Sequence, residues 1–165
     1  MTKPKEGFFS NWLYRDGDAI SPEVVIFDID GVLADASARQ HFVRGSRPDW
    51  EGFFNACNDD PLIDEVAELL KVIDGKFSVV LLTGRPISVQ EKTRNWIEHH
   101  EIRWDLLIMR NSGDYSAARN FKRGEIVKLR SHGMTLRLGF EDDARNVEMF
   151  TEEKVPCIYL HSGYY

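Results

Sequence analysis

The sequence is poor in cysteine and has no long apolar run. Its two cysteines, Cys57 and Cys157, lack neighbours at metal-ligand spacing, so a disulfide framework and a cysteine-ligated metal domain are both excluded. No apolar stretch approaches the length of a membrane span, and the first twenty residues lack the apolar core of a signal peptide. We therefore expect a cytoplasmic protein with reduced thiols and no membrane partner.

The sequence also lacks an excess of basic charge. Its formal net charge is −6, which argues against a protein that coats nucleic acid through a broad basic face. A few local arginines remain compatible with binding of a strand end. The length of 165 residues, with 42% apolar and 29% charged residues, is typical of one globular domain with its own core.

Apolar runs alternate with segments of helical periodicity from residue 23 onward. Five buried strands are predicted at 24–27, 79–82, 106–109, 136–140 and 157–160, and helices at 60–75, 86–97, 121–130 and 147–150. This alternation predicts an α/β fold, a three-layer Rossmann-like parallel sheet covering 23–165, with a small lid insert at 36–59. Residues 1–22 are predicted to be an N-terminal arm or helix.

Two carboxylates follow the first predicted strand, in Asp28-Ile29-Asp30-Gly31. Ligand sites of parallel sheets lie at the carboxyl ends of the strands, and acids gathered there need a cation such as Mg²⁺. Asp28 is a candidate nucleophile toward phosphorus, and Asp30 a candidate general acid and base. A solvated Asp-Gly turn is the alternative for this short pattern.

Other strand ends carry complementary groups. Thr83-Gly84-Arg85 offers a hydroxyl and backbone N–H groups for a phosphate, and Glu141-Asp142-Asp143 crowds three acids that need a metal or a lysine nearby. Lys122, in the third predicted helix, is the candidate lysine. Their joint placement favours a phosphate-handling site over separate surface features.

These elements, in this order, resemble the haloacid dehalogenase superfamily of phosphohydrolases. The resemblance implies that Asp28 is the nucleophile, that Asp30 is the general acid/base, and that Thr83 and Lys122 bind the phosphoryl group. It further implies a Mg²⁺ ion held by Asp28, the main-chain carbonyl of Asp30, and Asp142, with Glu141 assisting through water.

A closer resemblance, over nearly all of 24–165, is to the 3′-phosphatase domains of bacteriophage polynucleotide kinase–phosphatases. It is carried by Thr83-Gly84-Arg85, Thr93–Ile97, Gly113-Asp114, Asn146–Phe150 and Ser162–Tyr165. It implies that Arg39, Gly84 and Arg85 bind substrate; a solvated loop position for Arg39 and a buried ion pair for Arg85 are the alternatives. The sequence contains no P-loop for the kinase activity of that family.

Two positions depart from the family pattern. The family has acidic residues just before the third-motif lysine, where this chain has Ala117-Ala118-Arg119-Asn120-Phe121, and the fourth motif begins with Glu141 in place of Asp. A supporting ion pair for Lys122 is therefore expected to be absent or to come from elsewhere.

The insert contains arginines and aromatic residues, which suits a phosphorylated DNA or RNA 3′ end or a nucleotide. The set is Arg39, His41, Arg44, Arg47, Trp50, Phe53 and Phe54. These residues either clasp phosphate and stack a base or form a small satellite core. The leading hypothesis is a Mg²⁺-dependent polynucleotide 3′-phosphatase; the alternatives are a small-metabolite phosphatase, a phosphotransferase and a non-catalytic phosphate-binding module.

Overall fold

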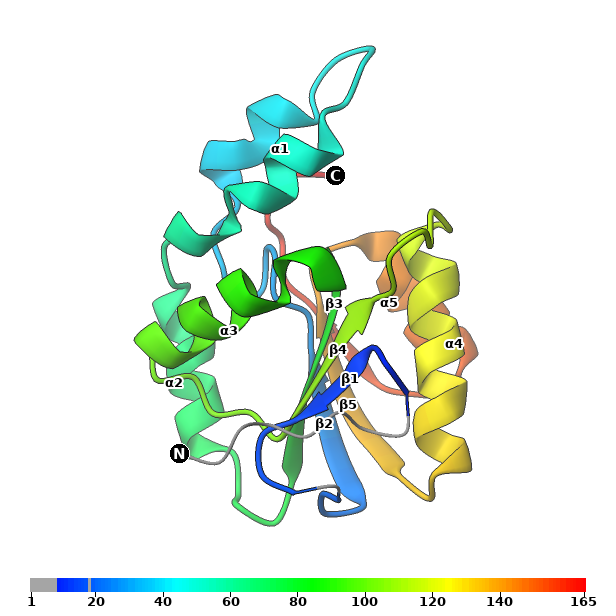
Figure 1. The fold of residues 1–165 in the computed structure, drawn as a ribbon. Helices are drawn as coiled ribbons and strands as arrows, with labels where there is room; N and C mark the ends of the chain where they lie inside the picture. Colours follow the sequence, from blue (N-terminus) through cyan, green and yellow to red (C-terminus); the bar gives the residue numbers. More distant parts are fainter. Residues whose placement is uncertain (1–8, 18) are drawn as a thin grey trace.

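A computed structural model describes residues 9–17 and 19–165 as a mixed six-stranded sheet with helices on both faces (Figure 1). In chain order the elements are β1 (Trp12–Tyr14), β2 (Glu23–Phe27), η1 (Ser37–Phe42), α1 (Trp50–Asn55), η2 (Cys57–Asp59), α2 (Asp64–Val72), β3 (Ser78–Pro86), η3 (Ile87–Val89), α3 (Gln90–His99), β4 (Leu106–Arg110), α4 (Ala118–Ser131), β5 (Thr135–Glu141), α5 (Ala144–Glu152) and β6 (Cys157–Tyr159). The predicted α/β class is confirmed.

The sheet has the order β1-β4-β3-β2-β5-β6, with β2 at its centre. All neighbouring strands are parallel except β1, which pairs antiparallel with β4 at one edge. Helices α2 and α3 lie on one face and α4 and α5 on the other (Figure 1). Because β2, β3, β4 and β5 are parallel, their carboxyl ends meet at one edge, where the candidate residues gather.

The strand cores alternate between two apolar clusters. Val25 and Phe27 pack with the α2 and α3 side, whereas Val24 and Ile26 pack with the α4 and α5 side. Successive strand residues point to opposite faces, so an unbroken apolar run is buried on both. This is why the five parallel strands could be located from composition alone.

Three local predictions differ from the structure. Trp12–Tyr14 form a strand, not a helix, because they pair with the edge of β4, and residues 1–8 lie outside the described residues. The first long helix starts at Asp64, not at Asp60-Pro61, because Leu62 bridges to Ala34. Pro86 ends β3 and does not open a helix; α3 begins at Gln90.

The predicted insert is partly helical and stands above the carboxyl edge of the sheet (Figure 1). It consists of η1, α1 and η2, with a loop between η1 and α1. Phe53 is buried and Phe54 packs against the core, whereas Trp50 is 54% exposed. The satellite core and an exposed aromatic surface are therefore both present.

Candidate active site

The loop after β2 brings Asp28 to the carboxyl edge of the sheet. Its turn is closed by hydrogen bonds from Leu33 N and Ala34 N to the carbonyl of Ile29, each 2.8 Å long. Gly31 has a φ of 79°, and a Cβ at this position would lie 2.0 Å from Asp142 Oδ2. Only glycine allows the loop this close to the Asp142 carboxylate.

Asp28, Glu141 and Asp142 form an acidic group that suits a metal ion. One carboxylate oxygen from each lies within 4.8 Å of the others, and all three residues are buried. Burial and neighbouring acids, chiefly Asp28, raise the pKa of Asp142 to about 7 and contribute to a pKa of about 8 for Glu141. Asp142 Oδ2 is buried without a hydrogen-bond partner among the described residues. A hard divalent cation such as Mg²⁺ fits this donor set, because it would neutralise the acids and satisfy that oxygen.

Lys122 lies beside these acids. Its Nζ is 2.9 Å from Asp28 Oδ2 and also pairs with a carboxylate oxygen of Glu141. Burial opposes the charge of Lys122, but Asp28 and Glu141 more than offset it and raise its pKa above the usual range. The expected support for Lys122 thus comes from the strand end, through Glu141, and not from the residues before the lysine. Asn146 Nδ2 donates to the second Glu141 oxygen at 3.3 Å.

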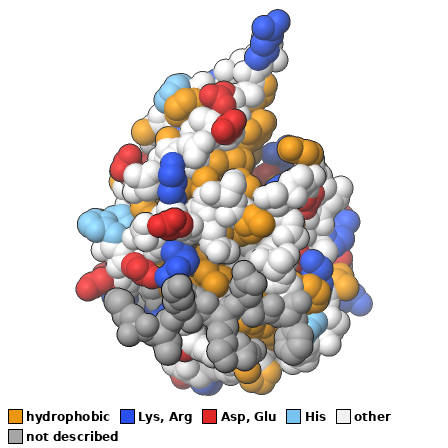
Figure 2. Space-filling view, in the orientation of Figure 1, with side chains coloured by type: hydrophobic (Ala, Val, Ile, Leu, Met, Phe, Trp, Pro, Cys, Tyr) orange, Lys and Arg blue, Asp and Glu red, His pale blue; other side chains and the backbone are white. Residues whose placement is uncertain are grey.

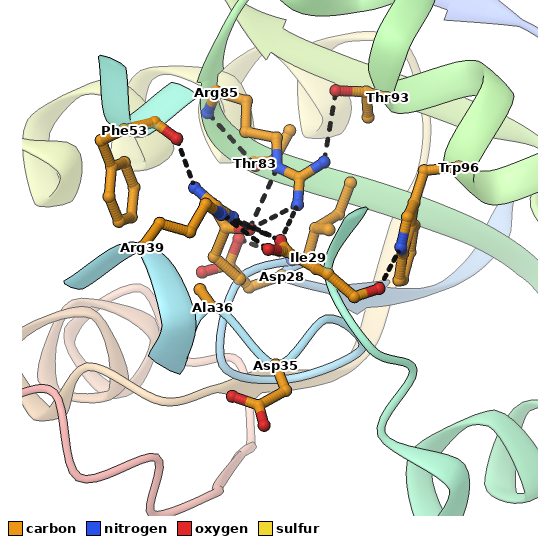
Figure 3. Close-up of polar contacts among 12 residues, drawn as sticks. Asp28, Ile29, Asp35, Ala36, Arg39, Phe53, Thr83, Arg85, Thr93 and Trp96 are labelled. Atoms are coloured by element: carbon orange, nitrogen blue, oxygen red, sulfur yellow. Dashed lines mark hydrogen bonds and ion pairs between the residues drawn. The ribbon is translucent and has the colours of Figure 1, made fainter. Parts of the chain in front are cut away.

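A second cluster joins two arginines to two carboxylates. Arg39 Nη2 and Arg85 Nη2 donate to the same Asp30 oxygen at 2.5 and 2.6 Å. Both also donate to Asp60 Oδ2, at 2.6 and 3.1 Å. Figure 3 shows the guanidinium groups of Arg39 and Arg85 pointing toward each other, one from the insert and one from the end of β3.

Both arginines are buried and held on their other side. Arg39 is 2% exposed, donates to the carbonyl of Phe53 at 3.0 Å and lies 4.3 Å over its ring. Arg85 is fully buried and contacts Thr93 Oγ1 at 3.4 Å (Figure 3). The alternative of a solvated loop position for Arg39 is wrong, and the buried ion pair expected as the alternative for Arg85 is present.

This cluster sets the charge of Asp30. Although burial raises the pKa of Asp30, the guanidinium groups of Arg85 and Arg39 lower it further, and the net shift is downward. Asp30 is therefore a carboxylate at neutral pH. Its side chain faces the arginines, so it is not one of the three clustered metal-binding side chains.

Thr83 and Gly84 lie where β3 reaches the site. The Thr83 side chain is 1% exposed, and its Oγ1 accepts a hydrogen bond from Arg85 N at 3.2 Å. The Gly84 carbonyl accepts from Arg110 Nε at 3.3 Å. Strand β3 thus delivers the hydroxyl and the arginine of the Thr83-Gly84-Arg85 motif to one edge.

The family assignment rests on a match over most of the chain. Residues 22–165 match the family model of the polynucleotide kinase PNKP phosphatase domain. The chain belongs to this family. The phosphatase domain is therefore a hydrolase of the haloacid dehalogenase type, as the sequence predicts.

Solved structures agree with the assignment. Two structures of a Pnkp1/Rnl/Hen1 complex, one described as an RNA repair complex, match with TM-scores of 0.70 and 27% and 28% identity. Each match covers 90% of this chain but only 45% and 48% of the other, so this chain spans less than half the length of those proteins. The class C acid phosphatase from Bacillus anthracis shares the fold at 14% identity, with a TM-score of 0.61 over 89% of this chain and 69% of that one. Among curated proteins there is no significant sequence match.

The phosphatase domain contains site residues that the sequence patterns did not single out. Asp60 was assigned to a helix N-terminus, and its position 25 residues before Arg85 gives no motif that links the two. Asn146 supported only the family resemblance. Asp60 and Asn146 both owe their place in the site to contacts between distant segments. Both are buried polar side chains, which normally have hydrogen-bond partners.

Proposed function

We propose that this domain hydrolyses 3′-phosphates at nucleic-acid ends, with Mg²⁺ and through an aspartyl-phosphate on Asp28. One observation carries the proposal: Asp28 pairs with Lys122 and belongs to the acidic group with Glu141 and Asp142, in a chain of the PNKP phosphatase family. A carboxylate that contacts both a cation and a metal-binding group suits attack on a phosphoryl group.

The chemistry divides into two displacements. Asp28 attacks phosphorus while the bond from phosphorus to the 3′-oxygen breaks, and Asp30 gives that oxygen a proton. Water then attacks the aspartyl-phosphate, loses its proton to Asp30 and releases phosphate, which regenerates Asp28. Lys122 and the Thr83 hydroxyl bind the phosphoryl oxygens. Asp28, the Asp30 carbonyl and Asp142 would hold Mg²⁺, which would supply positive charge to the phosphoryl group.

Arg39 and Arg85 act in this proposal on both Asp30 and the substrate. Their contacts fix the Asp30 carboxylate and favour its charged form, which suits the proton-accepting step. Proton donation to the leaving oxygen requires Asp30 to be protonated against that field, so turnover should be sensitive to either arginine. The direct contact of Arg39, Gly84 and Arg85 with substrate stays a proposal from the family resemblance.

The nucleic-acid substrate is supported by family membership and by the relatives from the Pnkp1/Rnl/Hen1 complex. We also place this activity in the cytoplasm, because both cysteines are free thiols, as expected in a reducing compartment. No described helix is long and apolar enough to cross a membrane.

The test is phosphate release from purified protein with Mg²⁺. Substrates are a 3′-phosphorylated oligonucleotide, its 5′-phosphorylated counterpart and a panel of phosphorylated metabolites. We expect release from the 3′-phosphate, loss of release in Asp28→Asn, and a phosphoprotein in wild type that is trapped by acid quench. Turnover of metabolites alone would retain the Asp28 chemistry and refute the nucleic-acid substrate. No turnover of any substrate would refute the proposed phosphatase activity.

A further inference from the structure

Trp50 and Tyr165 are two of the exposed aromatic side chains among the described residues; Tyr115, at 94%, and Tyr159, at 45%, are also exposed. Trp50 is 54% exposed and belongs to the insert after β2; Tyr165 is 69% exposed and follows β6. Single exposed hydrophobic side chains are normal on a protein surface, so these two rings matter through their position near the site. Both are carried by segments that leave carboxyl ends of parallel strands, as the catalytic residues are.

Trp50 is held as a platform. Asp49 caps α1 by accepting from Gly52 N at 2.8 Å, and the Trp50 ring lies 5.7 and 6.0 Å from the rings of Phe53 and Phe54. Phe53 in turn lies under the Arg39 guanidinium, which contacts Asp30. A chain of contacts therefore fixes the exposed ring relative to the catalytic cluster.

Tyr165 lies near the acidic group. Its ring packs 5.2 Å from the Arg145 guanidinium, which pairs with Asp143, the residue after Asp142. The Tyr164 hydroxyl donates to Asp35 at 2.9 Å, which ties the tail to the residue before the insert. In Figure 1 the carboxyl end of the chain lies beside the insert, so Trp50 and Tyr165 belong to segments on the same side of the sheet.

Arginines accompany the exposed tryptophan. Arg44 and Arg47, in the loop between η1 and α1, are exposed and make no side-chain hydrogen bond or ion pair to other described residues. Figure 2 shows Lys or Arg side chains at the tip of this projection. Arg39, the third arginine of the insert, is buried against Asp30 and Asp60, so the exposed arginine charge of the insert belongs to Arg44 and Arg47. We call the surface that carries Trp50, Tyr165, Arg44 and Arg47 the rim.

We propose that a single-stranded nucleic-acid end lies across this rim, with its terminal base on Tyr165, an upstream base on Trp50, and its backbone near Arg44 and Arg47. The inference rests on the proposed function and specifies its substrate. Aromatic faces accept every base, and two arginines bind phosphate without reading sequence, so recognition is sequence-independent. Because the chain as a whole carries a net charge of −6, we expect the electrostatic attraction of nucleic acid to come from the arginines of the rim.

Fluorescence tests the Trp50 contact directly. Trp12, Trp96 and Trp104 are 3% exposed or less, so Trp50 is the one tryptophan that solvent and ligand can reach. The probe is a 3′-phosphorylated hexanucleotide, added to Asp28→Asn protein so that it is not hydrolysed. We expect the probe to quench tryptophan fluorescence to a saturating level, and the quenching to disappear in the double variant Asp28→Asn/Trp50→Ala. Binding without quenching, measured by anisotropy of a labelled probe, would overturn the Trp50 contact.

Kinetics separates stacking from structure. With 3′-phosphorylated substrates of one to six nucleotides, KM should fall with length in wild type. Trp50→Ala should raise the KM for the hexanucleotide about 5- to 100-fold and weaken the length dependence, with Val72→Ala, also exposed, as the matched control. An abasic site at the stacked position should reduce binding to wild type but not further reduce binding to Trp50→Ala.

Charge is tested by salt. In the variant Arg44→Ala/Arg47→Ala, the negative slope of log affinity against log salt should become shallower by about 1.4, the value for two single-strand phosphate contacts. Arg137→Ala, on β5, is the control. If 3′-phosphates are released but length, abasic and salt effects are the same in all variants, the rim proposal fails while the proposed function stands. If no oligonucleotide is a substrate, the proposed function fails first.

Discussion

Asp60 illustrates how much one buried carboxylate decides at this site. It accepts from Arg39 through both oxygens, at 2.8 and 2.6 Å, and Trp96 Nε1 donates to its main-chain carbonyl at 2.7 Å. Asp30 and Asp60 together match the two guanidinium charges, so the cluster is neutral as a unit. A buried arginine that loses one of two acidic partners is left with uncompensated charge.

We therefore expect Asp60→Asn to damage both stability and catalysis. Loss of the charge should lower the melting temperature by roughly 6 to 20 °C, since breaking a buried pair costs about 3–5 kcal/mol. The freed arginines should also move Asp30, so kcat should fall at least tenfold. Thermal unfolding and steady-state kinetics measure the two effects.

Asp59→Asn is the control, because Asp59 is the exposed neighbour of Asp60, and its side chain accepts a hydrogen bond from Asn58 and has no other side-chain partner among the described residues. It should leave both quantities within error of wild type. Equal effects of the two substitutions would show that the segment is sensitive for a reason other than the arginine cluster.

At the scale of elements, Lys122 lies on helix α4, and a carboxylate that pairs with it comes from strand β5. Position 118 lies one helical turn before Lys122, on the same face of α4, and carries alanine. Glu141, at the end of β5, pairs with Lys122. We infer that Glu141 does the work that an acid at position 118 could do.

The pairing of Lys122 with Glu141 predicts a rescue. Glu141→Asp should shorten the carboxylate, weaken the contact with Lys122 and lower kcat/KM at least tenfold. Adding Ala118→Asp should restore much of that loss, because it places an acid at i−4 from the lysine. Steady-state kinetics of the single and double variants tests the coupling.

Ala117→Asp in the same background is the matched control. It adds the same charge one residue earlier, at the exposed N-cap position of α4, where it points away from Lys122. Rescue by Ala117→Asp as well would attribute the effect to charge at the helix N-terminus and refute the exchange.

At the scale of the whole molecule, the acidic group couples stability to pH and metal. The pKa of Asp142 is about 7 and that of Glu141 about 8, both above the ordinary values of 3.8 and 4.5. At a pH between the ordinary and the raised pKa values, the folded protein holds protons on these two acids that the unfolded chain has released. The metal-free protein therefore loses stability as pH rises from about 5 to 8.

We expect the melting temperature of metal-free protein to fall over that range, by more than about 10 °C if both acids contribute fully, and Mg²⁺ to remove most of the fall. Because binding displaces protons from both acids, Mg²⁺ affinity should rise with pH. Differential scanning fluorimetry with and without Mg²⁺ measures both. Asp142→Asn should flatten the pH dependence and abolish the Mg²⁺ effect; an unchanged profile in this variant would contradict the assignment.

The sequence by itself determined the architecture and the reactive groups. Uninterrupted apolar runs such as Val79–Leu82 are buried on both faces of a sheet, so the parallel strands follow from local composition. Because the carboxyl ends of such strands meet, the sequence predicts that Asp28, Thr83 and Asp142 lie at one edge of the sheet. The edge strand β1 was missed, because its three residues gain their conformation from pairing with β4.

Only the tertiary structure decided which charges face one another. The pairing of Glu141 with Lys122, and of Asp60 with Arg39 and Arg85, joins segments 19 to 25 residues apart. No periodicity or spacing encodes these contacts, because they depend on how the insert folds back onto the end of β3. The same packing buries Phe53 and leaves Trp50 in solvent, since a helix as short as α1 can turn only one side toward the core.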